Sequence, residues 1–332
     1  MSPVPADDEI RLAGLATALR PLGLGTWAWG DRATWGMGGY DTGFDEATIA
    51  GAWEASAERG VRLIDTAEVY GDGESERIIG RLLARDDRPR DEFVIATKFL
   101  PAPWKLNVPV AMRDACLASI DRLGVERIDL YQLHGPVSLR SPAVLAESLA
   151  ELHREGLIGA VGVSNYSARE VRTMHRSLRR MSLPLSTNQI EYSPLRVRPE
   201  RTGLLQTCAE LGVTVLAYSP LGQGRLTGKY RVGSPPPGRR TFSAHPMELV
   251  DRIVAALRVI GEAHDDRSPA QVALRWIIQK GAVPIPGAKN ADQADQNAGA
   301  LGWELTAADV ARIDALALEG QRTLRQRVWQ HG

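Results

Sequence analysis

The 332-residue chain lacks three things: it has only two cysteines, no net charge and no long apolar run. Cys116 and Cys208 lie far apart within apolar helical patterns, so we expect two buried thiols rather than a disulfide or a metal site. The 40 basic residues balance the 40 acidic ones, which argues against nucleic acid or an anionic membrane surface as a partner. No apolar run approaches the roughly 20 residues that span a bilayer, so no membrane insertion is expected.

The hydrophobic content of 44% and the charged content of 24% are typical of an ordinary globular protein. The N-terminal segment 1–8 does not combine a basic stretch with an apolar one, so we expect no signal peptide. These features together favour a cytoplasmic protein in a reducing compartment. The sequence leaves the oligomeric state open.

Short apolar runs alternate with longer amphipathic segments along the chain. The runs that predict strands are Leu22–Gly25, Arg62–Asp65, Val94–Lys98, Ile128–Leu133, Ile158–Val163, Ser186–Gln189, Thr214–Tyr218 and Val283–Ile285. The helical patterns include Asp45–Arg59, Ser75–Arg85, Val110–Leu123, Pro142–Glu155, Ala168–Leu178, Arg201–Leu211, Asp292–Ala300 and Ala307–Ala317. Evenly spaced units without a domain-scale linker favour a (β/α)8 TIM barrel over a doubly wound sheet. We expect a single domain over 1–332, with an N-terminal segment at 1–20, the barrel at 22–300, and a C-terminal helix and polar tail at 301–332.

Two long segments interrupt this alternation. Gly30–Gly43 is rich in glycine and tryptophan, and Gly222–His245 contains consecutive prolines, so we expect both to be loops. An extra helix at about Met247–Ala263 should follow the second loop, and Pro269 suits the start of the next helix. Because the βα loops of a barrel form the C-terminal mouth where active sites lie, both loops are candidates to cover a cofactor or a substrate.

Four polar residues follow three successive predicted strands. Asp65 ends the first strand and Tyr70 lies in the glycine-marked loop after it, and the next two strands end at Lys98 and at His134. A nearby ammonium favours a phenolate, and a carboxylate paired with that ammonium keeps it charged and in place. A histidine beside the phenol can hydrogen-bond a carbonyl group. Since neighbouring strand ends meet at the mouth of a barrel, these residues predict a proton-transfer site with Tyr70 as the general acid.

Motifs over almost the whole chain resemble those of the aldo-keto reductases. The first is Ile64–Gly71, and the segments that end at Lys98 and His134 resemble those that carry the catalytic lysine and histidine of that family. Further matches, in chain order, are Gly162–Tyr166, Asn188–Tyr192, Ala217–Gly222, Ile285–Asn290 and the downstream Asn297. The bacterial and plastid members related to pyridoxal reductase look most similar. The resemblance implies a TIM barrel that reduces a small aldehyde or ketone to the alcohol with NADPH, by direct hydride transfer.

The resemblance also implies a role for each matched position. Tyr70 would be the general acid, and Lys98 would lower its pKa. Asp65 would pair with Lys98, and His134 would orient the carbonyl group. The residues expected to bind the cofactor are Gly25, Thr26, Asp65, Ser164, Asn165, Gln189, Tyr218, Ser219, Pro220, Leu221, Gly222, Arg225, Ile285, Gly287, Lys289, Gln293 and Asn297.

Within this set, different residues are expected to contact the nicotinamide and the pyrophosphate of the cofactor. Ser164, Asn165 and Gln189 would hold the carboxamide, and Tyr218 would stack on the nicotinamide ring. The segment 219–222 and the loop beyond it would cover the pyrophosphate.

The expected cofactor is NADPH, with NADH as the alternative. Gln293 stands where many relatives carry an arginine that holds the 2′-phosphate of NADPH. Lys289 could supply the positive charge instead.

The substrate is less well defined than the cofactor. Tryptophans fall in loops at the predicted mouth at Trp27, Trp29, Trp35 and Trp104, of which Trp27 and Trp104 are the candidate substrate residues. Gly135 follows His134 where similar reductases often have a bulky tryptophan, so we expect a wider pocket beside the histidine.

Two other functions are alternatives for a barrel with these sequence features. A barrel of this family can keep NADP(H) without turnover as a redox sensor or an accessory subunit, and the intact set of four polar residues argues against that. A barrel isomerase or lyase acting on phosphorylated substrates is disfavoured by the nicotinamide-type residues Ser164, Asn165, Gln189 and Tyr218.

Overall fold

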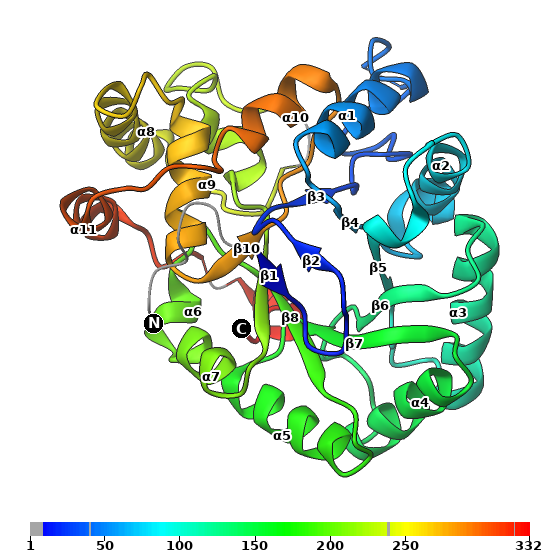
Figure 1. The fold of residues 1–332 in the computed structure, drawn as a ribbon. Helices are drawn as coiled ribbons and strands as arrows, with labels where there is room; N and C mark the ends of the chain where they lie inside the picture. Colours follow the sequence, from blue (N-terminus) through cyan, green and yellow to red (C-terminus); the bar gives the residue numbers. More distant parts are fainter. Residues whose placement is uncertain (1–8, 40, 238–239, 322) are drawn as a thin grey trace.

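The computed structural model describes residues 9–39, 41–237, 240–321 and 323–332, and its central feature is an eight-stranded parallel barrel. In chain order the strands are β3 (Gly23–Gly25), β4 (Leu63–Asp65), β5 (Val94–Phe99), β6 (Ile128–Leu133), β7 (Ile158–Ser164), β8 (Leu185–Glu191), β9 (Thr214–Tyr218) and β10 (Ala282–Pro284). Each strand pairs with the next one along the chain. The predicted single-domain (β/α)8 TIM barrel is confirmed, and each predicted strand is present with its ends shifted by at most two residues (Figure 1).

The barrel closes at Gly25, between its first and last strands. The Gly25 amide donates to the carbonyl oxygen of Pro286 at 3.0 Å, and a parallel bridge joins Gly25 to Gly287. A Cβ atom at position 25 would lie 2.7 Å from the carbonyl oxygen of Ile285. Glycine is therefore required here, because only a residue without a side chain lets the two backbones approach so closely.

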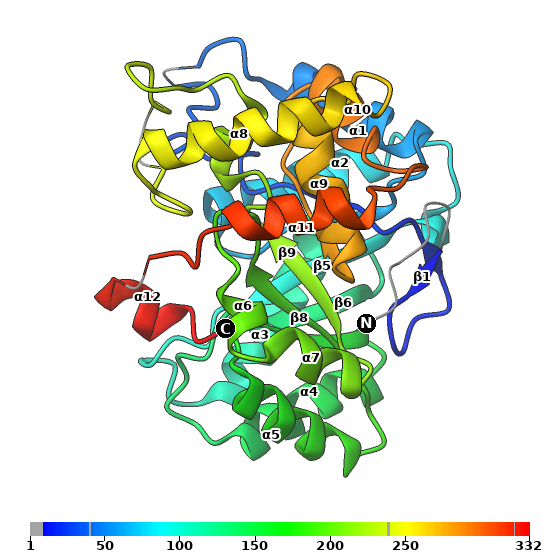
Figure 2. The same cartoon turned by 90° about the vertical axis from the view of Figure 1, so that its left-hand side faces the viewer.

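Helices surround the barrel on its outside (Figure 1). They are α1 (Glu46–Glu58), α2 (Glu74–Leu83), α3 (Val108–Leu123), α4 (Pro142–Arg154), α5 (Ala168–Arg179), α6 (Arg198–Arg201), α7 (Leu204–Glu210), α8 (Met247–Glu262), α9 (Pro269–Gln279), α10 (Ala291–Ala298) and α11 (Ala307–Leu316), with 3-10 turns at Tyr70–Gly73, Arg90–Glu92 and Gly222–Thr227. One more helix, α12 (Leu324–Trp329), lies at an end of the barrel (Figure 2). The start of α9 follows from local sequence. Ser268 and Gln271 form a capping box there, and Pro269 occupies the first turn.

A hairpin of β1 (Ile10–Arg11) and β2 (Ala18–Leu19) covers the N-terminal end of the barrel. Leu12 and Leu19 share a buried cluster with apolar side chains inside the barrel, such as Leu130. The sequence did not predict these strands, because a two-residue strand is too short for an alternating pattern to show.

Two other segments differ from the expectation. The helix predicted at Arg201–Leu211 is divided between α6 and α7, because Gly203 lies between them with a φ of 71°. The tail predicted to be polar contains α12, whose N-terminus is capped by Thr323. Figure 2 shows α12 and β1 at opposite ends of the barrel, which places the tail at the C-terminal mouth.

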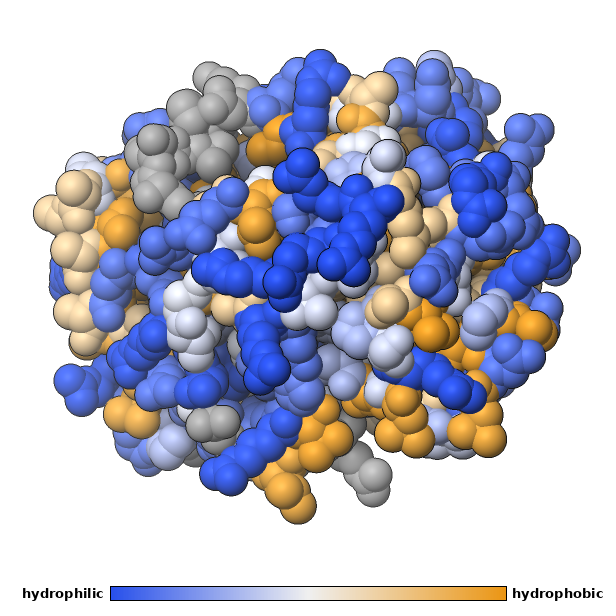
Figure 3. Space-filling model, turned by 90° about the horizontal axis from the view of Figure 1, so that it is seen from below, coloured by the Kyte–Doolittle hydropathy of each residue, from blue (hydrophilic) through white to orange (hydrophobic). Residues whose placement is uncertain are grey.

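The thiols and the surface agree with an ordinary globular chain. Cys116 and Cys208 are both buried and unbonded, as predicted. On the face seen in Figure 3, hydrophilic residues predominate and hydrophobic ones form small separate groups. Within the described part of the chain, none of the helices has the length and apolar character needed to cross a membrane.

Candidate active site

A cavity of about 1000 Å³ opens at the C-terminal end of the barrel strands, a size that suits a cofactor together with a small ligand. Both long loops and α12 contribute to its wall. The predicted site residues that line it are Gly25, Thr26, Trp27, Asp65, Tyr70, His134, Ser164, Asn165, Gln189, Tyr218, Ser219, Pro220, Leu221, Ile285, Gly287, Lys289, Gln293 and Asn297. The fold thus brings together residues that lie as much as 272 positions apart in the sequence.

A buried ion pair joins the ends of β4 and β5. Lys98 Nζ donates to Asp65 Oδ2 at 2.7 Å and to the carbonyl oxygen of Thr66 at 2.6 Å. The second carboxylate oxygen, Asp65 Oδ1, accepts from Gln189 Nε2 at 2.7 Å and from Gln132 Nε2 at 3.3 Å. Burial lowers the pKa of Lys98, and the Asp65 carboxylate opposes that shift. The pair therefore holds a lysine nitrogen at a fixed position with its charge compensated.

Tyr70 lies five residues after the end of β4, at the start of a 3-10 turn, and Lys98 Nζ is 5.1 Å from the centroid of its ring. Burial, followed by the carboxylate of Asp65, raises the pKa of Tyr70 well above its ordinary value of 10.0. This direction differs from the expectation that Lys98 lowers that pKa, because burial of the phenol and the Asp65 carboxylate both raise it. Tyr70 is consequently a protonated phenol, the form in which it can donate a proton.

His134 follows β6, and its ring meets that of Tyr70 edge-on, with centroids 5.8 Å apart at 77°. Its Nδ1 is buried and has no hydrogen-bond partner among the described residues. Burial, together with the Lys98 ammonium, lowers the pKa of His134 to about 3. The imidazole is therefore neutral at ordinary pH, and its one N–H can donate a hydrogen bond without adding charge to the site.

The low pKa of His134 predicts a titration that NMR can follow. Its C2–H signal should keep the neutral chemical shift as the pH falls from about 8 to about 5, whereas an ordinary histidine, with a pKa near 6.5, titrates across that range. Loss of the signal in His134→Asn assigns it, and the urea-unfolded chain provides the normal titration for comparison. A midpoint near pH 6.5 in the folded protein would contradict the buried, neutral ring.

A hydrogen-bonded cluster joins the ends of β7, β8 and β9. Ser164 Oγ donates to the carbonyl oxygen of Gln189 at 2.9 Å, and Asn165 Nδ2 donates to Ser164 Oγ at 3.2 Å. The Tyr218 hydroxyl donates to Asn165 Oδ1 at 3.0 Å and accepts from Gln330 Nε2 at 2.6 Å. Asn165 has a φ of 63°, a left-handed conformation in which asparagine is enriched. The cluster thus fixes amide and phenol groups in the cavity wall.

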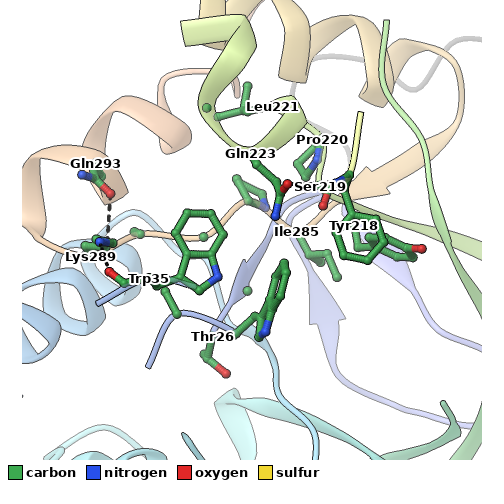
Figure 4. Close-up of a pocket in the computed structure, with 18 of the residues that line it drawn as sticks. Thr26, Trp35, Tyr218, Ser219, Pro220, Leu221, Gln223, Ile285, Lys289 and Gln293 are labelled. Carbon is green, nitrogen blue, oxygen red and sulfur yellow. Dashed lines mark hydrogen bonds between the residues drawn. The ribbon is translucent and has the colours of Figure 1, made fainter. Parts of the chain in front are cut away.

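The opposite part of the cavity is lined by the loop that carries Trp35, by the segment 219–224 and by the segment 285–293 (Figure 4). Lys289 Nζ donates to the carbonyl oxygen of Trp35 at 2.8 Å and forms an ion pair with Asp41 at 3.0 Å. The Lys289 amide donates to Gln293 Oε1 at 3.0 Å. Trp35 Nε1 and Gln223 Nε2 are buried without a partner among the described residues, and Figure 4 shows both side chains facing the same space. Unpartnered buried donors in a cavity wall are suited to a polar ligand.

A comparison with known protein families agrees with both the fold and the sequence motifs. The model described as the aldo/keto reductase family matches residues 21–318. The chain belongs to the aldo/keto reductase family. It is 36% identical over 324 residues to a chloroplastic pyridoxal reductase of Arabidopsis thaliana, with 94% of this chain and 87% of that protein covered. Membership makes the chain an NAD(P)H-dependent oxidoreductase.

Solved aldo-keto reductases share the architecture over nearly their full length. The glycerol dehydrogenase from Gluconobacter oxydans superposes with a TM-score of 0.80 and 29% identity, covering 96% of this chain and 99% of that one. An aldo-keto reductase from Klebsiella pneumoniae, solved in complex with NADPH, gives a TM-score of 0.72 and 26% identity, with 95% and 96% covered. The family resemblance inferred from the motifs is confirmed.

Four predicted site residues of this aldo-keto reductase lie outside the cavity wall. Lys98 is fully buried behind it and reaches the site through Asp65. Gly222 and Arg225 hold the loop together instead of facing the cavity, because the Arg225 guanidinium donates to the Gly222 carbonyl oxygen at 3.0 Å. The prediction of Trp104 as a substrate residue is wrong, since Trp104 is 76% exposed and does not line this cavity.

Among the residues of the cavity wall that escaped the sequence reasoning are Gln223, Phe242 and Trp329. Phe242 lies in the irregular loop after β9, yet its ring is 5.6 Å from that of Trp27 and 5.6 Å from that of Tyr218. The only available signal for Trp329 was a large aromatic residue in an otherwise polar tail.

The expectation of a widened pocket at Gly135 is also wrong. A Cβ atom at Gly135 would lie 3.1 Å from two carbon atoms of the Trp329 ring. The indole from the C-terminal tail therefore fills the space that a side chain at position 135 would need.

Proposed function

We propose that this aldo-keto reductase uses NADPH to reduce an aldehyde or ketone to the alcohol, by direct hydride transfer to the carbonyl carbon. The observation that carries the proposal is the set of Asp65, Tyr70 and a neutral His134 in the wall of one cavity, with Lys98 buried behind it and paired with Asp65. This set of groups is suited to orient and protonate a carbonyl oxygen. The NADPH complex of the Klebsiella pneumoniae relative supports the same cofactor here.

The residues present fit such a cofactor along the length of the cavity. At one end, Asn165 and Gln189 offer amide groups for the carboxamide, and Tyr218 offers an aromatic face for the nicotinamide ring. Farther along, the buried Nε2 of Gln223 has no partner among the described residues and could donate to phosphate oxygens. Positive charge at the wall comes from Lys229, Arg240 and Lys289.

Each catalytic group has a role that its environment explains. When bound, the nicotinamide supplies the hydride. Tyr70 would give its proton to the carbonyl oxygen, since its raised pKa keeps the phenol protonated, and the nearby Lys98 ammonium would stabilise the phenolate that remains. Neutral His134 would donate a hydrogen bond that orients the carbonyl group. Asp65 would keep Lys98 in place.

The test is the loss of NADPH absorbance with a panel of aldehydes and ketones. Pyridoxal belongs in the panel because a relative 36% identical to this chain is named for its reduction. Turnover with any of these compounds supports the proposal. Tight NADPH binding without turnover on any carbonyl compound would contradict it and favour a redox sensor or accessory subunit.

Lys289 gives the proposal a separate test of cofactor choice. Lys289→Met should weaken NADPH binding about tenfold or more, because a charge-assisted hydrogen bond contributes about 1.5–3 kcal/mol and 1.4 kcal/mol corresponds to a factor of about ten. NADH lacks the 2′-phosphate and serves as the internal control, so its affinity should change much less. Titrations of both cofactors by fluorescence measure the two dissociation constants. An equal loss for NADPH and NADH would contradict a 2′-phosphate role for Lys289.

A further inference from the structure

The C-terminal tail is bound to the active site by several independent contacts. Gln330 Nε2 donates to the Tyr218 hydroxyl at 2.6 Å and to Glu191 Oε2 at 2.6 Å. The backbone amides of His331 and Gly332 donate to the carbonyl oxygen of Asn165 at 3.1 and 3.3 Å. Tyr218 and Asn165 belong to the proposed nicotinamide site, so the tail is fastened to the residues that would hold the cofactor.

These bonds place Trp329 inside the cavity wall, next to the catalytic histidine. The rings of His134 and Trp329 have centroids 5.6 Å apart at 62°. On the other side of the site, the Trp27 ring is 6.4 Å from that of Tyr70. Tyr70 and His134 therefore lie between the Trp27 and Trp329 indoles in one series of ring contacts. A carbonyl group that reaches both Tyr70 and His134 would lie close to these indoles.

Gly135 makes room for the Trp329 indole. Because a Cβ atom at position 135 would come within 3.1 Å of that ring, a larger residue there and the indole in its present position exclude each other. The wall beside His134 is thus supplied by Trp329, which lies 194 positions after Gly135 in the sequence.

Among the described residues, the cations that line the cavity lie away from this aromatic end. They are three, and each lies over a ring in the opposite part of the cavity: Lys229 over Tyr230, Arg240 over Trp35 and Tyr230, and Lys289 over Trp35 and Phe44. An anionic substrate group beside Trp329 would lie away from these three described cations. Flat, uncharged rings pack well against indole faces and edges.

We propose that Trp329 is a specificity-determining residue: its indole, seated against Gly135, forms a wall of the substrate pocket that favours flat, uncharged aromatic aldehydes and ketones. The proposal rests on the proposed carbonyl reductase function. The Gln330 bond to Tyr218 makes Gln330 a positioning residue, since it holds the indole and the nicotinamide site in one arrangement.

The experiment compares Trp329→Ala with Val328→Ala, a matched control on the same helix whose side chain is 59% exposed. The first readout is the ratio of kcat/KM for benzaldehyde to kcat/KM for propanal. The second readout is the affinity for benzamide, a non-reducible analogue of benzaldehyde, measured by calorimetry in the presence of NADP+. Trp329→Ala should lower the ratio and the affinity about tenfold each, the scale of a contact in a hydrophobic pocket, and Val328→Ala should change neither.

Gly135→Trp and the double variant Gly135→Trp/Trp329→Ala test whether a side chain at position 135 and the Trp329 indole compete for the same space. Gly135→Trp alone should displace the indole and lower benzamide affinity, and removing Trp329 in that background should restore it, because the new indole takes over the wall. Such a recovery departs strongly from additivity, as expected for two residues in contact.

Two results would overturn the inference: Trp329→Ala leaving both readouts unchanged, or additive losses in the double variant. Its failure is distinguishable from failure of the proposed function. If the native chain turns over no carbonyl compound, the reductase proposal fails, and the benzamide affinities of the variants still decide the role of Trp329.

Discussion

Tyr70→Phe is expected to lower kcat for NADPH-dependent carbonyl reduction by about 10³-fold or more, because it removes the proton donor and keeps the ring. General acid–base groups typically contribute about 10²–10⁴-fold. Steady-state kinetics measures the effect, and NADPH affinity and the melting temperature should stay close to those of the native chain. The raised pKa of Tyr70 adds a pH expectation: loss of the phenolic proton should not reduce the rate anywhere below about pH 10.

Tyr131→Phe is the matched control. The Tyr131 hydroxyl is buried in β6 without a hydrogen-bond partner among the described residues, and it lies outside the cavity wall. Removal of that hydroxyl should leave kcat within about twofold of the native value, an effect of less than about 0.5 kcal/mol. If Tyr70→Phe retained activity within tenfold of the native chain, Tyr70 would not be the acid.

Asp65→Asn is expected to destabilise the fold as well as the site. Asp65 and Lys98 side chains are 3% and 0% exposed, and their nitrogen and oxygen atoms are 2.7 Å apart. Removing one partner of a buried ion pair leaves an uncompensated charge and typically costs about 3–5 kcal/mol of unfolding free energy. Urea denaturation should show that loss, and kcat should fall because Lys98 is no longer held beside Tyr70.

Two further variants distinguish the effect of burial on stability from the effect of losing a carboxylate. Asp295→Asn removes the same group from an exposed pair with Arg59, whose side chains are 47% and 62% exposed, and should change the unfolding free energy by less than about 1 kcal/mol. Asp65→Asn/Lys98→Met removes the buried ammonium too and should recover part of the lost stability. A single Asp65→Asn variant as stable as Asp295→Asn would show that the pair is not buried in the native protein.

The barrel could be predicted because its strands are buried on both sides. Buried parallel strands form short, nearly continuous apolar runs in the sequence, and the polar residues Asp65, Lys98 and His134 stood out because they come at or directly after the ends of such runs. Asp65 and Lys98 illustrate this: each closes an apolar segment, and the parallel register brings the two strand ends together.

Contacts between distant segments could not be predicted in the same way. The Trp329 indole beside Gly135 depends on where a tail docks after the last barrel strand, and no periodic pattern encodes that position. Trp35 and Lys289 meet for a similar reason, since both lie on loops whose paths depend on tertiary packing. Trp104 shows the opposite error, because a tryptophan in a loop at the mouth can still face solvent.

The direction of the Tyr70 pKa also required the structure. The sequence placed an ammonium near the phenol, and that alone suggested a lowered pKa. In the fold the Lys98 ammonium is bound to Asp65 and to the Thr66 carbonyl oxygen, while burial acts on the phenol directly. Burial and the carboxylate therefore outweigh the ammonium.

Direct hydride transfer to a carbonyl carbon is the central claim, and isotope transfer tests it most directly. NADPH carrying deuterium at both hydrogen positions of the nicotinamide C4 would be incubated with benzaldehyde and the native chain, and the alcohol examined by mass spectrometry. The account predicts benzyl alcohol with one deuterium on the former carbonyl carbon, and no such product with Tyr70→Phe over the same time. Benzyl alcohol without deuterium, or no alcohol despite tight NADPH binding, would contradict it.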